Sequence, residues 1–347
     1  MNPLLRELEF PHAKPPAPAA TQEVAPGVHW LRMPLPFALD HINLWLLEDD
    51  DGYTIVDCGF GSDETRALWE QIFAKHVNGR TVKRVIVTHF HPDHMGNAHW
   101  LTQRFGVGLW TPQAEFLTAH AAHESFGPFG KEPLIELFRT NGIDEERLHL
   151  VRKRGNSYAR AVPALPMSYR RIMDGDIIDI NNRGWRAIMG YGHAPEHAAL
   201  YCEELGVLIS GDMVLPSIST NVGVWAADPL GNPLQLFLDS TTRYGELPAN
   251  TFVLPSHGLP FRGIRKRAAQ LHAHHKERLA EVEAACGEPK HAVDLLPVLF
   301  RRTLDMHQIF FAIGESIAHL HYLEAHARLK RMVDDGGVIR FVRANAN

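Results

Sequence analysis

Cysteine is scarce in this sequence, and long apolar runs and a leader-like start are absent. Three cysteines occur among 347 residues, which excludes a disulfide framework and fits a reducing cytoplasm. The first residues, MNPLLRE, contain no apolar core of the kind that a signal peptide needs. No stretch approaches the roughly eighteen uncharged apolar residues of a membrane-spanning helix. We therefore expect a cytoplasmic protein with no membrane partner, in which Cys58 and Cys202 are buried thiols.

An excess of either charge is also missing. The 35 Lys+Arg and 40 Asp+Glu residues give a net charge of -5, which argues against a protein that binds nucleic acid over its whole surface. Hydrophobic residues make up 45% of the chain and charged residues 22%, as in ordinary globular proteins. A chain of 347 residues can bury a large core, so we expect one large and one small domain.

Histidine, by contrast, is abundant, and it concentrates in one stretch. The chain has 22 histidines, and residues 88–96 read THFHPDHMG. The β-branched, apolar run over residues 82–87 predicts a buried strand directly before them. His89 and His91 lie two residues apart in extended backbone, so their side chains share a face and can reach one metal ion.

The same stretch continues into a second pair of candidate ligands. Pro92 ends the strand, and Asp93 and His94 follow as a helix begins. Imidazole nitrogens together with a carboxylate suit zinc and related transition ions. A histidine-rich turn without a metal is the alternative, but it would leave four potential ligands unused at a strand end.

This HxHxDH pattern after an apolar strand resembles the metallo-β-lactamase superfamily, whose hydrolases carry such a loop at the edge of an αββα sandwich. Downstream, residues 190–197 read GYGHAPEH and resemble the TPGHSPGH loop of that family. The resemblance puts His193 at the ligand position and His197 at the usual supporting position. Two departures, Tyr191 for Pro and Glu196 for Gly, alter the wall of the loop and bear on substrate rather than on metal.

Two further strand ends complete the ligand set that the resemblance implies. Asp212 ends the apolar run 207–212, and His257 follows the run 252–255. By the assignment of the family, one zinc ion is held by His89, His91 and His193, the other by Asp93, His94 and His257, and both by Asp212. Iron or manganese are the alternative metals.

The resemblance also implies how such a centre works. A hydroxide shared by the two ions attacks the substrate, and Asp93 is the catalytic residue that orients it. Asp57, at the end of another expected strand, is either a supporting acid beside the metals or a turn-capping residue.

The spacing of apolar residues, together with the positions of Gly and Pro, predicts the remaining helices and strands. The interval 112–173 resembles the helical insert that covers the active site in this family, and the tail resembles the small winged-helix-like domain of some members. His319, His321 and His326 lack metal-ligand spacing, so we expect them on a helix surface. The expected strands include 28–33, 42–47, 53–56, 107–110, 177–180 and 185–189, and the expected helices include 63–76, 114–123, 134–141, 264–285 and 309–331.

These features predict an α/β protein with an αββα sandwich, a helical insert and a small C-terminal domain. The predicted parts are a flexible arm over 1–26, a catalytic domain over 27–261 with a lid at 112–173, and a mainly helical, winged-helix-like domain over 262–347.

The predicted activity is hydrolysis by a dinuclear zinc centre, most favourably of a thioester, as in glyoxalase II, or of another acyl ester. A phosphodiesterase or endoribonuclease, a lactonase, and an iron-dependent enzyme similar to persulfide dioxygenases are the alternatives. The expected partner is therefore a small ester or thioester, with nucleic acid less favoured and a homodimer as an open alternative.

Within the thioester interpretation, the insert and its arginines suggest an acyl-CoA substrate. Arg170 and Arg171 could hold a phosphate-bearing carrier, and apolar side chains of the insert could cover an acyl chain. These apolar residues are Phe116, Leu117, Phe126, Phe129, Leu134 and Phe138. We expect long-chain acyl thioesters to be cleaved faster than single-stranded RNA, and truncation after about Gly287 to affect solubility or assembly more than chemistry.

Overall fold

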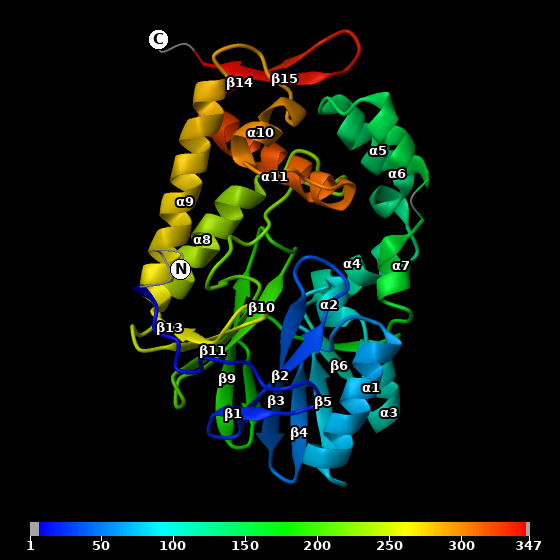
Figure 1. The fold of residues 1–347 in the computed structure, drawn as a ribbon, viewed down its shortest axis with the longest axis vertical. Coiled ribbons are helices and arrows are strands. Elements are labelled where there is room, and N and C mark those ends of the chain that lie inside the picture. Colours follow the sequence, from blue (N-terminus) through cyan, green and yellow to red (C-terminus); the bar gives the residue numbers. More distant parts are fainter. Residues whose placement is uncertain (1–6, 154, 345–347) are drawn as a thin grey trace. The chain divides into compact units, whose positions relative to one another are not determined.

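The computed structural model describes residues 7–153 and 155–344 (Figure 1). Two compact units divide them. The first unit contains residues up to 124, 156–220 and 241–268, and the second contains 125–155, 221–240 and the residues from 269 onward. Each unit is described by itself.

The first unit contains a seven-stranded sheet in the order β1-β2-β3-β4-β5-β6-β7. The strands from β1 to β4 pair antiparallel, and those from β4 to β7 pair parallel. Their bounds are β1 (Gln22–Ala25), β2 (Val28–Pro34), β3 (His41–Asp49), β4 (Gly52–Val56), β5 (Thr81–Ile86), β6 (Leu109–Thr111) and β7 (Tyr169–Arg171).

A six-stranded sheet of the same unit has the order β13-β12-β11-β10-β9-β8. Within it only the pair β11–β12 is parallel. Its strands are β8 (Ile177–Ile180), β9 (Arg183–Gly190), β10 (His197–Cys202), β11 (Val207–Gly211), β12 (Phe252–Pro255) and β13 (Phe261–Arg262).

Two hydrophobic cores hold these layers together. One lies between the sheets and is built from alternate side chains of both, among them Trp30, Trp45, Trp185 and Leu254. The other lies between the seven-stranded sheet and its helices, where Trp69 is fully buried. This arrangement confirms the predicted sandwich of the metallo-β-lactamase type.

Short helices connect and cover the strands of the first unit. Ser62 accepts a hydrogen bond from the N–H of Thr65 at 3.1 Å and so caps the first of them. Beyond its tenth residue this helix changes into a π-helical turn, η2. The elements are α1 (Asp63–Ile72), η2 (Phe73–Val77), α2 (Pro92–Met95), α3 (Ala98–Phe105), α4 (Gln113–His123) and α7 (Ser157–Ala161).

The described part of the expected arm is tied to the sheets rather than loose. Glu9 forms a β-bridge with Arg262, and the side chain of Leu8 is buried. Residues 22–25 form β1, which pairs with β2. The first six residues of the expected arm lie outside the described residues.

The second unit is mainly helical. It ends in an antiparallel hairpin of β14 (Leu329–Val333) and β15 (Ile339–Arg343). The boundary between the units falls within α8 (Pro233–Gly245) and α9 (Ile264–Ala285). The other elements are η3 (Gly127–Phe129), α5 (Lys131–Thr140), α6 (Glu145–Lys153), η4 (Val293–Leu295), α10 (Leu296–Leu299) and α11 (Met306–Ala325).

Two expectations about the last helix are wrong. The predicted helix over 309–331 ends at Ala325, because Ala327 has a φ of 55° that a right-handed helix does not allow, and 329–331 join β14 instead. His319 and His321 are buried, with exposed fractions of 0% and 5%, and only His326 lies on the surface as expected. Periodicity did not reveal that this helix is packed on more than one side.

The expected insert over 112–173 is divided between the two units. Its helices α4 and α7 belong to the first unit, and α5 and α6 belong to the second. In the second unit Phe138 is fully buried and stacks on Phe310 with 5.4 Å between ring centroids. Phe138 is therefore a core residue and cannot cover a substrate. The predicted domain boundaries and the lid stay predictions.

Candidate metal centre

The loop that follows β5 takes the predicted course. β5 ends at Ile86, and α2 begins with Pro92 in a position where a missing N–H removes no helical hydrogen bond. The N–H groups of His94 and Met95 both donate to the carbonyl of His91, at 3.0 and 2.9 Å. The tight turn therefore presents the four candidate ligands of this loop within six residues.

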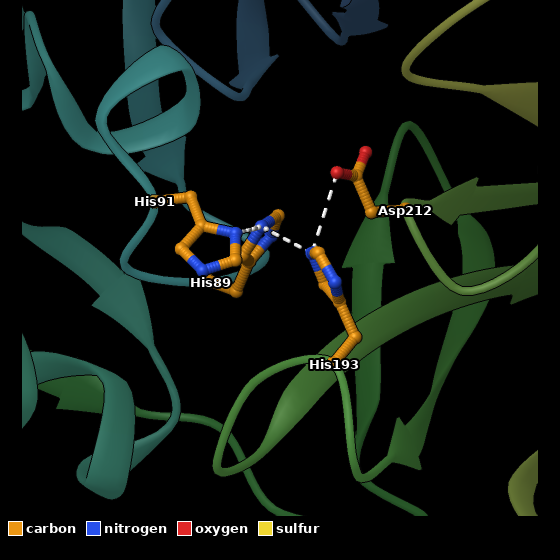
Figure 2. Close-up of side chains that lie close together, drawn as sticks. All are labelled: His89, His91, His193 and Asp212. Carbon is orange, nitrogen blue, oxygen red and sulfur yellow. Dashed lines mark hydrogen bonds and ion pairs between the residues drawn. The ribbon is translucent and has the colours of Figure 1, made fainter. Parts of the chain in front are cut away.

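Four side chains form what we call the first metal group: His89, His91, His193 and Asp212, with one atom of each within 4.8 Å of the others. Figure 2 shows them pointing toward one another from the loops that follow β5, β9 and β11. His89 Nε2 lies 2.9 Å from His91 Nδ1 and 3.2 Å from His193 Nε2. His193 Nε2 lies 3.3 Å from Asp212 Oδ2.

Asp93, His94 and His257 form the second metal group. Asp93 Oδ2 lies 3.8 Å from His94 Nε2 and 3.5 Å from His257 Nε2. Asp212 also faces this group, since its Oδ1 lies 3.5 Å from His94 Nε2 and 3.4 Å from His257 Nε2. The two oxygens of the Asp212 carboxylate therefore face different groups. The structure brings all seven predicted ligands together around this carboxylate.

The donor atoms of these groups fit divalent metal ions. Among the described residues, His94 Nε2 and Asp212 Oδ1 are buried side-chain atoms without a hydrogen-bond partner. Burying a polar atom without a hydrogen-bond partner is costly, so buried polar atoms are usually paired with a protein group, a water molecule or an ion. Both atoms lie where the two metal groups meet. The nitrogen and oxygen atoms of these groups suit zinc and related transition-metal ions.

The charges of the metal-free centre divide the histidines into two kinds. Burial lowers the pKa of His89 well below its ordinary value, and the neighbouring histidines lower it further. Burial also acts to lower the pKa of His94, but Asp57, Asp93 and Asp212 outweigh it and hold that pKa well above its ordinary value. The pKa of His257 is raised as well, because Asp212 outweighs the effect of burial. The centre therefore holds protons that a metal ion must displace.

Asp57, whose role the sequence left open, supports the second metal group. Its carboxylate is fully buried and accepts hydrogen bonds from Thr88 N–H at 2.8 Å and from Thr88 Oγ1 at 3.0 Å. Its other oxygen lies 2.8 Å from His94 Nδ1. This contact orients the His94 ring and leaves Nε2 to face Asp212.

His197 takes the supporting position that the resemblance implies, and it acts on backbone. Its Nε2 accepts a hydrogen bond from Asp212 N–H at 3.1 Å. The ring packs so closely on Gly211 that a Cβ there would lie 2.2 Å from His197 Nε2, and Gly211 has a φ of 52°. Only glycine fits this strand end, which sets the direction of the Asp212 side chain.

The loop that carries His257 is held by residues that the sequence interpretation missed. His257 Nδ1 donates to the carbonyl of His41 at 2.8 Å, and His41 Nε2 accepts from Gly258 N–H at 2.9 Å. Asn43 Nδ2 donates to the carbonyls of Pro255 and Gly258, at 2.8 and 3.0 Å. The available signal was Asn43 itself, a polar residue within the otherwise apolar run 42–47.

Glu115 is a second residue that the sequence interpretation missed. It lies in the first turn of α4, is fully buried, and accepts hydrogen bonds from the N–H groups of Phe90 and Glu196. Burial raises the pKa of Glu115 to about 7, although these two N–H groups act to lower it. No sequence pattern around Glu115 indicates that it supports the centre. The one available signal was its partner Glu196, which stands where the family loop has Gly.

Known proteins resemble this chain over both of its parts. A family model described as "Metallo-beta-lactamase superfamily" matches residues 38–257, and one described as "Metallo-beta-lactamase-like, C-terminal domain" matches residues 279–344. A solved structure of a beta-lactamase domain protein from Burkholderia ambifaria is 48% identical, has a TM-score of 0.93, and matches over 99% of this chain and 100% of that one.

More distant relatives agree with this result. A metallo-beta-lactamase family protein from Thermus thermophilus is 32% identical with a TM-score of 0.77, over 92% of this chain and 100% of its own. The "Probable metallo-hydrolase YqjP" of Bacillus subtilis (strain 168) is 27% identical over 85% of this chain and 91% of its own. Within the described residues, no helix is both long and apolar enough to cross a membrane.

Proposed function

Because the chain belongs to the metallo-beta-lactamase superfamily and is a metal-dependent hydrolase, we propose that it binds two zinc ions and cleaves an acyl ester, most favourably a thioester. The observation that carries the two-ion proposal is the Asp212 carboxylate. Its Oδ2 faces the first metal group at 3.3 Å and its Oδ1 faces the second at 3.4 and 3.5 Å. A single carboxylate between two sets of nitrogen ligands suits a bridging role.

Each residue has a defined task in this proposal. His89, His91 and His193 would hold one ion, Asp93, His94 and His257 would hold the other, and Asp212 would contact both. Bound zinc lowers the pKa of a coordinated water toward about 7 and polarises the attacked carbonyl. Asp93 is only partly buried, and its carboxylate would orient the attacking water, as the family resemblance implies.

A protein nucleophile is not needed for this reaction, and the cysteine beside the site is unsuited to be one. Cys58 is fully buried, and burial raises the pKa of its thiol well above the ordinary value. A neutral, buried thiol is a poor nucleophile. This favours direct attack by water over a covalent thioester intermediate on the enzyme.

The support for a thioester with an anionic carrier lies in two exposed arginines of the first unit. Arg170 and Arg171 belong to β7, and the guanidinium of Arg170 stacks over Trp110 at 4.0 Å. Stacking holds the side chain in one orientation while leaving its donors for a phosphate group. The proposed partner is accordingly a small ester or thioester whose leaving group carries a phosphate.

Metal analysis and a substrate panel test this function. Purified protein should carry close to two zinc ions per chain, and Asp212→Ala should lose at least one. One tightly held ion in fully loaded protein would contradict the two-ion proposal, and stoichiometric iron with oxygen consumption would replace hydrolysis by oxygenation. Asp63→Asn, an exposed carboxylate on α1, is the matched control and should keep both ions.

The substrate panel compares kcat/KM for a long-chain acyl-CoA, a lactone, a phosphodiester and an RNA oligomer on one preparation. We expect the thioester to be cleaved fastest. Its cleavage rate should rise with pH through an apparent pKa of about 7 and stay high in mild alkali. Asp93→Ala should abolish this activity. Faster cleavage of the RNA or the lactone, abolished by the same variant, would mean that the bond is a different one.

A further inference from the structure

The buried carboxylate of Glu115 joins two loops of the candidate centre without belonging to either metal group. Its Oε2 accepts a hydrogen bond from Phe90 N–H at 2.8 Å, and its Oε1 accepts one from Glu196 N–H at 2.5 Å. The side chain has an exposed fraction of 0%. A carboxylate removed from water is costly unless it is hydrogen-bonded, and these two backbone groups satisfy one oxygen each.

The two N–H groups lie at informative places in the chain. Phe90 stands between His89 and His91, and Glu196 stands three residues after His193. One carboxylate therefore fixes the backbone between His89 and His91 and also the end of the loop that carries His193. These histidines come from the two different sheets, since one loop follows β5 and the other precedes β10.

The contact is reciprocal and is supported from the other side of the loop. Glu196 Oε2 accepts a hydrogen bond at 3.1 Å from the N–H of Ala114, the residue directly before Glu115. Tyr158 Oη donates to the carbonyl of Phe90 at 2.6 Å. The backbone of Phe90 is thus held through both its N–H and its carbonyl group, which belong to consecutive peptide units.

The second metal group is supported by different residues. Asp57 contacts His94 Nδ1 at 2.8 Å, and the carbonyl of His41 accepts from His257 Nδ1 at 2.8 Å. Neither contact involves Glu115 or Glu196. The supports of the two groups therefore differ in part, although Asp57 also contacts Thr88, whose Oγ1 lies 3.1 Å from His89 Nδ1. Substitutions at Glu115 and in the loop that carries His257 should thus affect the two affinities for metal differently.

We propose that Glu115 and Glu196 form a clamp that positions the three histidines of the first metal group and so sets the affinity of that group for its ion. The inference rests on the proposed two-ion function. Glu115 is a positioning residue, because it acts on the ligands through the backbone of their loops. In Glu115→Gln one oxygen acceptor becomes an amide donor that faces a backbone N–H, which repels one loop while keeping the volume of the side chain.

Metal affinity in two half-site backgrounds tests the clamp. In His257→Ala the second group is disabled and the affinity for zinc reports on the first group, and in His193→Ala the reverse holds. We expect Glu115→Gln to weaken zinc binding by about 10–100-fold in the His257→Ala background and by less than about 3-fold in the His193→Ala background. His41→Ala, which removes the acceptor of Gly258 N–H in the loop that carries His257, is the control and should show the opposite preference.

Variants of Glu196 give a second readout that does not depend on the fold surviving at Glu115. Glu196→Gln keeps an oxygen acceptor for Ala114 N–H and should bind zinc like the parent, whereas Glu196→Ala should weaken the first group selectively. Equal weakening in both backgrounds, or no change in either, would overturn the clamp. If the unsubstituted chain binds fewer than two ions, the proposed function itself fails, and that result is visible before any clamp variant is made.

Discussion

At the scale of single residues, the candidate centre depends on which nitrogen of each histidine is already engaged. His94 and His257 use Nδ1 for contacts to Asp57 and to the carbonyl of His41, so their Nε2 atoms face Asp212. His91 instead offers Nδ1, which lies 2.9 Å from His89 Nε2. For His94 and His257 the ligand atom is therefore selected by contacts outside the metal groups.

Gly211 allows the first prediction. Gly211→Ala would add a Cβ at 2.2 Å from His197 Nε2 on a backbone with a φ of 52°. We expect a loss of more than about 2 kcal/mol in the free energy of unfolding, together with weaker metal binding, because Asp212 would be displaced. Gly206→Ala is the matched control in denaturant unfolding, since Gly206 has a φ of 62° and open space around it. Equal losses at both positions would show that backbone strain alone decides the result.

Glu315, in the second unit, allows a prediction about pH. Its hydrogen-bond partner is Asn221 Nδ2 at 3.2 Å, and burial raises its pKa from 4.5 to about 7. The unfolded chain therefore releases this proton at lower pH than the folded chain, so stability falls as the pH rises from about 4.5 to 7. Glu315→Gln should stabilise the protein at pH 8, by an amount on the order of 1–3 kcal/mol, and should have little effect near pH 4.5. Urea unfolding at the two pH values checks it, and a gain that is the same at both would contradict the titration argument.

At the scale of secondary-structure elements, strand direction decides where the ligands gather. β4 and β5 run parallel, as do β11 and β12, so the loops after β5, β11 and β12 start at corresponding strand ends within each sheet. These loops carry six of the seven candidate ligands, and the turn between β9 and β10 adds His193. The strands thus bring the candidate ligands to one region, and the loops that follow them orient the side chains.

Helix capping gives a prediction at this scale. Asp305 accepts a hydrogen bond from Gln308 N–H at 2.9 Å, and Gln308 Oε1 accepts from Asp305 N–H at 3.3 Å, which together form a capping box at the start of α11. Asp305→Ala should lower the free energy of unfolding by about 1 kcal/mol, whereas Asp305→Asn should lower it by much less. Chemical unfolding measures both. An equal loss in the two variants would mean that charge rather than capping matters here.

At the scale of the whole molecule, metal binding, folding and pH are linked. The ligands of the centre come from both sheets of the first unit, so a bound ion stabilises the folded arrangement of that unit. Asp57, Asp93 and Asp212 raise the pKa of His94, and Asp212 raises that of His257, which keeps protons on the metal-free centre at higher pH than usual. Metal binding must release these protons.

Metal removal should therefore lower stability in a pH-dependent way. Treatment with a chelator should lower the melting temperature, with a lost stabilisation of about 4 kcal/mol if zinc is present at about a thousand times its Kd. Zinc affinity should fall as the pH falls through the raised pKa of His94, and binding should release protons into a weakly buffered solution. Calorimetry in two buffers of different ionisation enthalpy measures this release. Identical heats in both buffers would show that no proton is displaced.

The sequence by itself determined the metal-binding loop after residues 82–87 and the 264–285 helix, whose observed bounds agree, and its resemblance to the metallo-β-lactamase superfamily supplied the sandwich and the remaining candidate ligands. Apolar strands with ligands at their ends are local patterns, because a strand alternates its side chains and a proline ends it wherever it occurs. The tertiary structure alone decided the rest. Glu115 contacts residues 25 and 81 positions away, and His319 became buried only when its helix was covered. Such roles depend on which segments pack together, and no local pattern encodes a partner that lies far along the chain.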